Sequence, residues 1–151
     1  MAVTVQQLMT PYPVVVDAAT PVAQCARIMD DRDIGALGVM QEGQLVGVLT
    51  DRDIVIRAVA RDRDLATIAA GEIATPDVVA VPSDAAIDEA ERRMRERAVR
   101  RLFIVADDGR PLGILTLDDL LALRDPFSTV ARQIGEWSMV RSDLGYAGGD
   151  D

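Results

Sequence analysis

Apolar and polar positions along this chain form a pattern that predicts short strands and amphipathic helices in a fixed order. A β-branched run is followed by an apolar stripe at helical spacing, then by two apolar runs that flank a Gly-containing turn. The predicted elements are a strand at 14–16, a helix carrying Val22, Ala26 and Met29 on one face, a hairpin of strands at 36–40 and 45–49, and a helix from Asp51 to about Ala58. This order is β-α-β-β-α.

The same order of elements occurs twice. An offset of 65 residues places Thr10 and Pro11 over Thr75 and Pro76, and later the offset becomes 66, so that Gly47–Thr50 meets Gly113–Thr116. A single insertion within a turn, with the pattern resuming on both sides, is typical of a duplicated unit. The sequence therefore predicts two copies of one structural unit.

Additional helices are predicted at the edges of the two units. A short helix near Thr4, with Gln7 in the capping-box position, precedes the first unit, and residues 67–73 occupy the same place before the second. In the main helices, Thr20 is expected to cap the first, and Ile87, Ala90 and Met94 form the apolar face of the second.

The predicted fold is of the α/β class, with an α+β-like arrangement. One unit of about 55 residues leaves a sheet face open, and small domains are marginally stable, so the two units are expected to pack sheet to sheet around a pseudo-two-fold axis. Two related clefts should then form where strand ends of one unit meet the other. The predicted boundaries are 4–60 and 67–125 for the repeats, 126–144 for a C-terminal helix with Val130, Ile134 and Trp137 on one face, and 145–151 for a disordered tail.

Composition excludes many chemistries. The chain has 151 residues, and its 16 basic side chains are all arginine, because it contains neither Lys nor His. A histidine general base, a Schiff-base lysine and a phosphate-loop lysine are therefore excluded. Cys25 is the single cysteine, so neither an intrachain disulfide nor a zinc site with about four Cys or His ligands is expected. We expect no catalytic residues, no metal and no enzyme activity, and a core position for Cys25 on an apolar helix face.

Charge and hydropathy indicate which partners to expect. A formal net charge of −9 disfavours non-specific nucleic-acid binding, which depends on neutralising phosphates. No apolar run approaches the ~18 residues of a membrane span, and residues 1–30 lack the pattern of a secretory signal. We expect a cytoplasmic protein without nucleic-acid or membrane partners.

Two pairs of polar residues lie where strands end. Thr50 with Asp53, and Thr116 with Asp119, place a hydroxyl at each strand end and a carboxylate three residues later. This spacing is that of a capping box, which is a purely structural interpretation. The alternative is a ligand site, because a carboxylate can accept hydrogen bonds from both hydroxyls of a ribose while the hydroxyl and nearby amides face phosphate.

Arg100 and Arg101 lie between the second helix and the middle strand of the second repeat, opposite Gly35 and Ala36 in the first. They pair with nearby acids, extend their charged ends into solvent, or bind phosphate, which suits guanidinium groups. The cleft that they reach should then bind phosphorylated ligands better than the other cleft. The other arginines of this region, Arg92, Arg93, Arg95 and Arg97, accompany several Glu residues and are expected to form a solvated, ion-paired face.

The repeated unit with its Gly-h-h-Thr-x-x-Asp ending (h, an apolar residue), and Asp33–Leu37 before a hairpin, resembles a tandem pair of CBS domains (a Bateman module) of the stand-alone bacterial type, over roughly residues 4–125. The resemblance implies that Asp53 or Asp119 holds a ribose with Thr50 or Thr116 beside it. It also implies that Arg100 and Arg101 serve the Asp53 cleft, with Val78 lining the adenine pocket there and Pro13 lining the one beside Asp119. Where the family often has proline in the middle strand, this chain has Gly38 and Phe103.

The leading functional hypothesis is therefore a non-catalytic sensor. It would bind AMP, ADP, ATP or S-adenosylmethionine as a regulatory ligand, need no cofactor, and form the homodimer that the resemblance implies. The alternative is a protein–protein adaptor without a ligand, which acts on an unidentified protein target through its dimer and the C-terminal helix. A cleft lacking a cation at Gly35 and Ala36 would suit phosphate less well.

Overall fold

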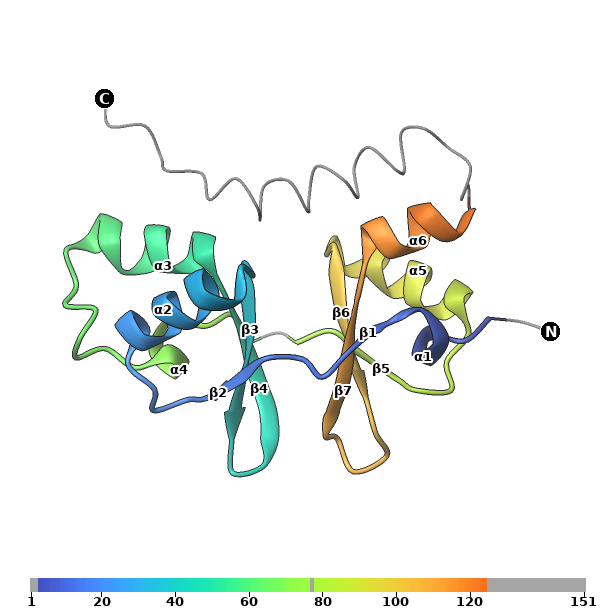
Figure 1. Ribbon diagram of the computed structural model, residues 1–151, viewed down its shortest axis with the longest axis horizontal. Coiled ribbons are helices and arrows are strands. Elements are labelled where there is room, and N and C mark those ends of the chain that lie inside the picture. The colour runs from blue at the N-terminus through green and yellow to red at the C-terminus, as the bar shows by residue number, and fades with distance from the viewer. Residues whose placement is uncertain (1–2, 77, 125–151) are drawn as a thin grey trace.

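A computed structural model describes residues 3–76 and 78–124 of the chain (Figure 1). The predicted C-terminal helix at 126–144 and the tail at 145–151 lie outside the described residues. The elements are two β-α-β-β-α units, each preceded by a four-residue helix. In chain order they are α1 (Val5–Leu8), β1 (Thr10–Pro11), β2 (Val15–Asp17), α2 (Val22–Arg32), β3 (Ala36–Gln41), β4 (Gln44–Thr50), α3 (Asp51–Arg57), a 3-10 turn η1 (Val59–Arg61), α4 (Ala70–Ile73), β5 (Ala80–Pro82), α5 (Ile87–Arg97), β6 (Arg101–Val105), β7 (Pro111–Thr116) and α6 (Leu117–Arg124).

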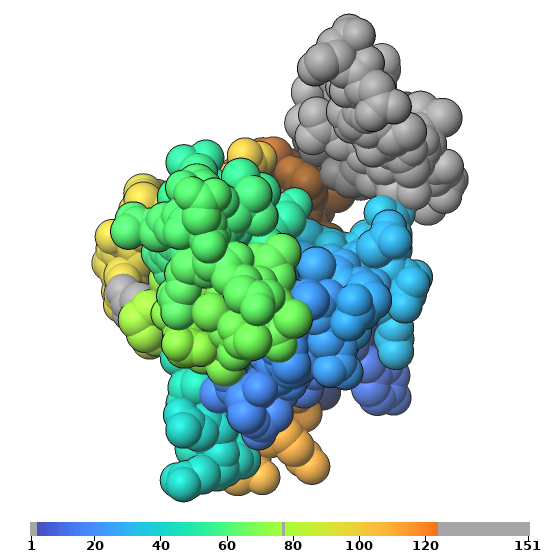
Figure 2. Space-filling model, turned by 90° about the vertical axis from the view of Figure 1, so that its left-hand side faces the viewer, coloured from blue at the N-terminus to red at the C-terminus, as the bar shows by residue number. Residues whose placement is uncertain are grey.

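The strands form two sheets that face each other, with the helices on the outer sides (Figure 1). One sheet has the order β2-β3-β4 and the other has the order β1-β7-β6-β5. Between them lies Phe103, which is 1% exposed and whose ring is next to Gly38 of the opposite sheet. The two hairpins protrude on the same side of the molecule, as Figure 2 also shows. The predicted sheet-to-sheet packing of two repeats is confirmed.

The two short helices are exchanged between the repeats. Val5 of α1 is fully buried in the core of the second repeat, and β1 pairs with β7, with Thr10 opposite Ile114. In the same way α4 packs into the core of the first repeat, and Thr75 forms a bridge with Val48 of β4. The sequence predicted both helices but did not indicate that each one crosses to the other unit.

The exchange explains the glycine in each Gly-h-h-Thr ending. A Cβ atom built on Gly113 would lie 2.7 Å from the carbonyl oxygen of Thr10, and one built on Gly47 would lie 3.0 Å from that of Thr75. The crossing backbone passes so close to the strand that a side chain at either glycine would collide with it. These glycines therefore allow the chain segments to cross between the repeats.

One predicted cap is wrong. The N-cap residue of α2 is Pro21, and no side chain caps this helix, although Thr20 was expected to do so. Its first two amides instead donate to the carbonyl oxygens of Ile68, at 3.0 Å, and Leu65, at 2.9 Å. Because carbonyl groups of the connecting segment before α4 already accept from the first amides of α2, no free amide remains there to donate to a capping hydroxyl.

Candidate functional site

The N-terminal end of α3 fixes the first Thr–Asp pair. The Asp53 amide donates to Thr50 Oγ1 at 3.1 Å, and the Thr50 amide donates to Asp53 Oδ2 at 3.0 Å. These two bonds form a complete capping box. The structural interpretation of this motif is thus correct for one carboxylate oxygen of Asp53.

The other oxygen of Asp53 has weaker partners. Thr75 Oγ1 lies 3.5 Å from Oδ1, and Arg57 Nη1 lies 3.8 Å from it. Arg57 Nη1 makes a shorter bond, of 2.9 Å, to the carbonyl oxygen of Ile73 at the end of α4. The Asp53 side chain is 12% exposed. Its Oδ1 atom is therefore held in place while long, weak contacts leave it able to accept a stronger donor.

The second Thr–Asp pair has the same geometry at the start of α6. Asp119 Oδ2 accepts from the Thr116 amide at 2.8 Å and from the Thr116 hydroxyl at 2.9 Å. Within residues 3–76 and 78–124, no hydrogen bond or ion pair to Asp119 Oδ1 is found. In both repeats, one oxygen caps the helix and the other is available to a ligand.

Arg100 and Arg101 enter the same region from the second repeat. Arg101 begins β6 and lies opposite Thr116 in the β6–β7 register, and the carbonyl oxygen of Arg100 accepts from the Leu117 amide at 2.8 Å. Among the described residues, no carboxylate forms an ion pair with either arginine. The interpretation that these side chains are neutralised by nearby acids is therefore not supported.

A pocket of 440 Å³ brings residues of both repeats together. Four of the predicted ligand-binding residues line it: Thr50, Asp53, Arg100 and Arg101. Val78 is not among the lining residues; its neighbour Val79 is. Phe103, noted in the sequence, also lines it, and sequence reasoning missed several other wall residues, namely Val48, Arg52, Thr75, Ala98 and Val99. We call this pocket the Asp53 cleft.

A second pocket, of 790 Å³, contains the other predicted residues, Pro13, Thr116 and Asp119. We call it the Asp119 cleft. Gly35 and Ala36 line it as expected, and neither carries a charge. Gly35 and Ala36 thus supply no cation, as expected, but Arg101 lines this cleft as well as the first and brings in a cation that the sequence did not indicate. The cation comes from the repeat that also supplies Asp119, which is why a comparison of equivalent positions could not find it.

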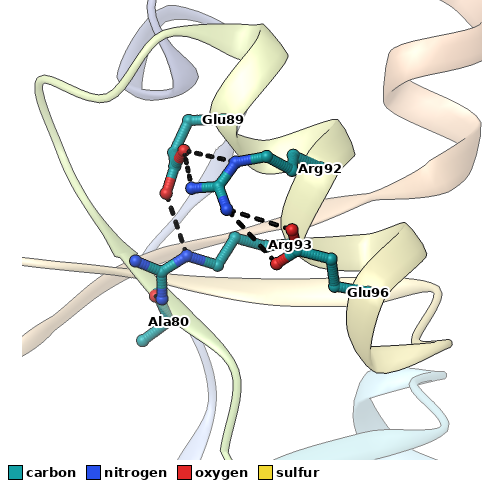
Figure 3. A network of polar contacts seen from close by, with 5 residues as sticks. All are labelled: Ala80, Glu89, Arg92, Arg93 and Glu96. Carbon is teal, nitrogen blue, oxygen red and sulfur yellow. Dashed lines mark hydrogen bonds and ion pairs between the residues drawn. The ribbon is translucent and has the colours of Figure 1, made fainter.

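Arg92 and Arg93 of α5 are engaged elsewhere. Figure 3 shows Glu89 between Arg92 and Arg93: Arg93 Nε donates to Glu89 Oε1 at 2.9 Å, and Arg92 contacts the other oxygen. Arg92 also donates to Glu96 at 3.1 Å. The hydrogen bonds from Arg92 and then Arg93 hold the pKa of Glu89 below its usual value. The predicted ion-paired face is confirmed for Arg92 and Arg93, which leaves Arg100 and Arg101 for the clefts.

Other candidate chemistry is limited. Cys25 is fully buried in the core of the first repeat, and this burial raises the pKa of its thiol, so the predicted core role is confirmed. The part of the chain that the structure describes holds no group of three or more Cys, His, Asp or Glu residues placed to bind a metal. None of its helices is long and apolar enough to cross a membrane.

The duplicated unit, the exchanged helices and the paired clefts define a tandem-repeat module with two related pockets. A family model described as the CBS domain matches residues 5–59 and again residues 70–125. The chain therefore belongs to the CBS-domain family, as a tandem pair.

Two curated relatives share much of the sequence. The CBS domain-containing protein YhcV of Bacillus subtilis is 32% identical over 117 residues, which cover 78% of this chain and 82% of that protein. Hypoxic response protein 1 of Mycobacterium tuberculosis is 40% identical over 96 residues, covering 63% and 66%. The chain spans only 48% of another relative, the protein MK0525 of Methanopyrus kandleri.

Solved structures share the fold. Hypoxic response protein I with two coordinated zinc ions has a TM-score of 0.71 and 34% identity, covering 79% of this chain and 97% of that one. The CBS domain pair of protein MJ0100, in complex with 5′-methylthioadenosine and S-adenosyl-L-methionine, has a TM-score of 0.70 and 25% identity, covering 80% and 98%. The cytosolic domain of the Mg²⁺ channel MgtE in complex with ATP has a TM-score of 0.68 and 31% identity, covering 80% and 48%.

Proposed function

We propose that this chain is a non-catalytic regulatory module that binds an adenosyl ligand, with the Asp53 cleft as its phosphate-accepting site. The observation that carries the proposal is the convergence on one pocket of a weakly bonded carboxylate oxygen from one repeat and, from the other, guanidinium groups that form no ion pair within the described part of the chain. A volume of 440 Å³ lies in the ~300–1,000 Å³ range of pockets that enclose small molecules.

Each part of a nucleotide has a matching group in this cleft. Asp53 Oδ1, with its two long contacts, is placed to accept hydrogen bonds from ribose hydroxyls. Arg100 and Arg101 offer planar donors to phosphate oxygens. Apolar wall residues, Val48 and Val79 among them, suit a purine ring. Complexes of related CBS proteins with ATP, S-adenosyl-L-methionine and 5′-methylthioadenosine support an adenosyl ligand for this chain.

A ligand in this cleft would act by changing the balance between conformations. Both repeats contribute walls, so a bound nucleotide contacts both units at once and favours the relative position of the units that fits it best. The population shifts by the difference in affinity between the two conformations, and no reaction is needed. This is the sense in which the module is a sensor.

Thermal unfolding with AMP, ATP and S-adenosylmethionine tests the proposal. A ligand at ~100 times its dissociation constant should stabilise the protein by about 2.7 kcal/mol. Asp53→Ala should abolish most of this shift. Asp31→Ala is the matched control, because Asp31 is an exposed carboxylate of α2 outside both clefts. If no adenosyl compound raises the melting temperature of the wild-type chain, the adaptor alternative replaces the sensor.

The proposal includes a homodimer, and exposed apolar side chains on α3 and α6 support it. Val55 and Ile56 of α3 are 54% and 46% exposed, and Leu121 of α6 is 41% exposed. Large apolar side chains exposed on a helix favour association with another apolar surface. Light scattering should give a dimer mass for the wild-type chain and a monomer mass for Ile56→Glu. A monomeric wild-type protein would remove this part of the proposal.

A further inference from the structure

The two clefts are built from equivalent positions of the two repeats. With the offsets found in the sequence, Thr50 and Asp53 correspond to Thr116 and Asp119, and the wall residue Val79 corresponds to Val14. The clefts therefore share a Thr–Asp corner and an apolar wall. Any difference in ligand preference must come from the equivalent positions where the residue types differ.

The balance of positive and negative side chains is opposite in the two clefts. Three arginines and one carboxylate line the Asp53 cleft, namely Arg52, Arg100, Arg101 and Asp53. One arginine and three carboxylates line the Asp119 cleft, namely Arg101, Asp33, Asp118 and Asp119. The sharpest exchange is at the second residue of α3 and of α6, where Arg52 in one repeat corresponds to Asp118 in the other.

These charges are available to a ligand. Within the described ranges, 3–76 and 78–124, the side chains of Arg52, Asp33 and Asp118 form no hydrogen bond or ion pair. A charged side chain that contacts a bound ligand acts over less than the screening length of ~8 Å at physiological ionic strength, so solvent ions screen it only in part. A phosphate would be attracted in the Asp53 cleft and repelled in the Asp119 cleft.

We propose that the two clefts select adenosyl ligands of opposite charge, and that Arg52 and Asp118 are the residues that determine this specificity. The Asp53 cleft takes a phosphorylated adenosyl ligand. The Asp119 cleft takes an adenosyl ligand that has no phosphate and carries a positive charge beside the ribose, as a sulfonium does. This inference rests on the proposed function and adds to it a separate ligand class for each cleft.

Calorimetric titration of the full chain tests the selectivity directly. AMP should bind with a stoichiometry of one per chain. In protein saturated with AMP, S-adenosylmethionine should bind more tightly than S-adenosylhomocysteine, which lacks the methyl group and the sulfonium charge, by about five-fold, the upper range for an exposed ion pair. Asp118→Asn should bring this ratio close to one.

The reciprocal exchange gives a gain of function. Asp118→Arg should create a second AMP site, raising the stoichiometry to two per chain, while Arg52→Asp should weaken AMP at the first site. Two equal AMP sites in the wild-type chain would overturn the inference alone. So would an affinity ratio between S-adenosylmethionine and S-adenosylhomocysteine that Asp118→Asn leaves unchanged. Absence of binding by all three compounds would overturn both the inference and the proposed function. Thermal unfolding of each variant shows that the fold is intact.

Discussion

A methyl group added at Gly38 should destabilise the protein, because this glycine lies where the two sheets touch. A Cβ atom there would lie 2.9 Å from Val15 Cγ1, 3.1 Å from Leu45 Cδ1 and 3.3 Å from Phe103 Cε1. The first two atoms belong to the same sheet as Gly38, and the third belongs to the opposite sheet. All three must shift to admit the methyl group.

The magnitude of the Gly38→Ala effect follows from two opposing contributions. Overpacking a core typically costs ~1–3 kcal/mol. Replacing glycine by alanine also restricts the unfolded chain, which offsets ~0.4–1 kcal/mol of that cost. We therefore expect a net loss of about 1–2 kcal/mol in the free energy of unfolding. For a chain of this length, each kcal/mol corresponds to ~2–4 °C in melting temperature.

Chemical denaturation of the wild type, Gly38→Ala, Phe103→Leu and the double variant would measure this effect and its origin. In the Phe103→Leu background, which shortens the opposing side chain, Gly38→Ala should cost ~0.5–1 kcal/mol less than in the wild type. Gly35→Ala is the matched control, because the nearest atom to its new Cβ is the flexible end of the Asp51 side chain, at 3.2 Å. A neutral Gly38→Ala, or an equal cost in both backgrounds, would refute the contact between the sheets.

Three further predictions concern the site and the local structure. Asp53→Ala should weaken AMP binding in calorimetry more than Asp119→Ala does, because the arginines favour phosphate in the Asp53 cleft; equal losses would contradict this asymmetry. Ala98→Gly should raise the free energy of unfolding by about 0.5–1 kcal/mol, because Ala98 caps the C-terminal end of α5 in the left-handed region, with a φ of 52°, which glycine adopts more easily. A denaturation midpoint that does not rise would exclude strain at this residue. Glu89→Gln should lower the melting temperature at neutral pH. Since Arg92 and Arg93 lower the pKa of Glu89, its contribution is present above the ordinary glutamate pKa and disappears as the pH falls through the lower folded value. A difference from wild type that does not shrink as the pH falls below the ordinary glutamate pKa would contradict it.

The local structure of this protein is largely readable from its sequence. The register between the repeats aligned Thr50 with Thr116 and Asp53 with Asp119, and these positions do start α3 and α6 with the same hydrogen bonds. Both hairpins and the apolar faces of α2 and α5 also lie where the periodicity predicts them. These features depend on neighbours close in the chain, so the pattern of residue types is enough to predict them.

The features that sequence reasoning missed depend on contacts between distant segments. A four-residue helix such as α1 has too few residues to show which core it enters, and Val5 could have packed in either repeat. The exchange of short helices determines that Thr75 bonds to Val48 and approaches Asp53. It also accounts for the missing cap at Thr20, because the connecting segment before α4 satisfies the amides of α2.

In the proposed function, the carboxylates of Asp53 and Asp119 combine two roles that the sequence presented as alternatives. In each, Oδ2 closes the capping box, which fixes the side-chain rotamer and so aims Oδ1. An aspartate whose orientation is set by the helix loses less conformational entropy when it binds a hydroxyl than a freely rotating one does. The cap thus prepares the binding group in advance. It follows that the Thr–Asp spacing should be read as a single device in which helix capping positions the atom that is available to the ligand.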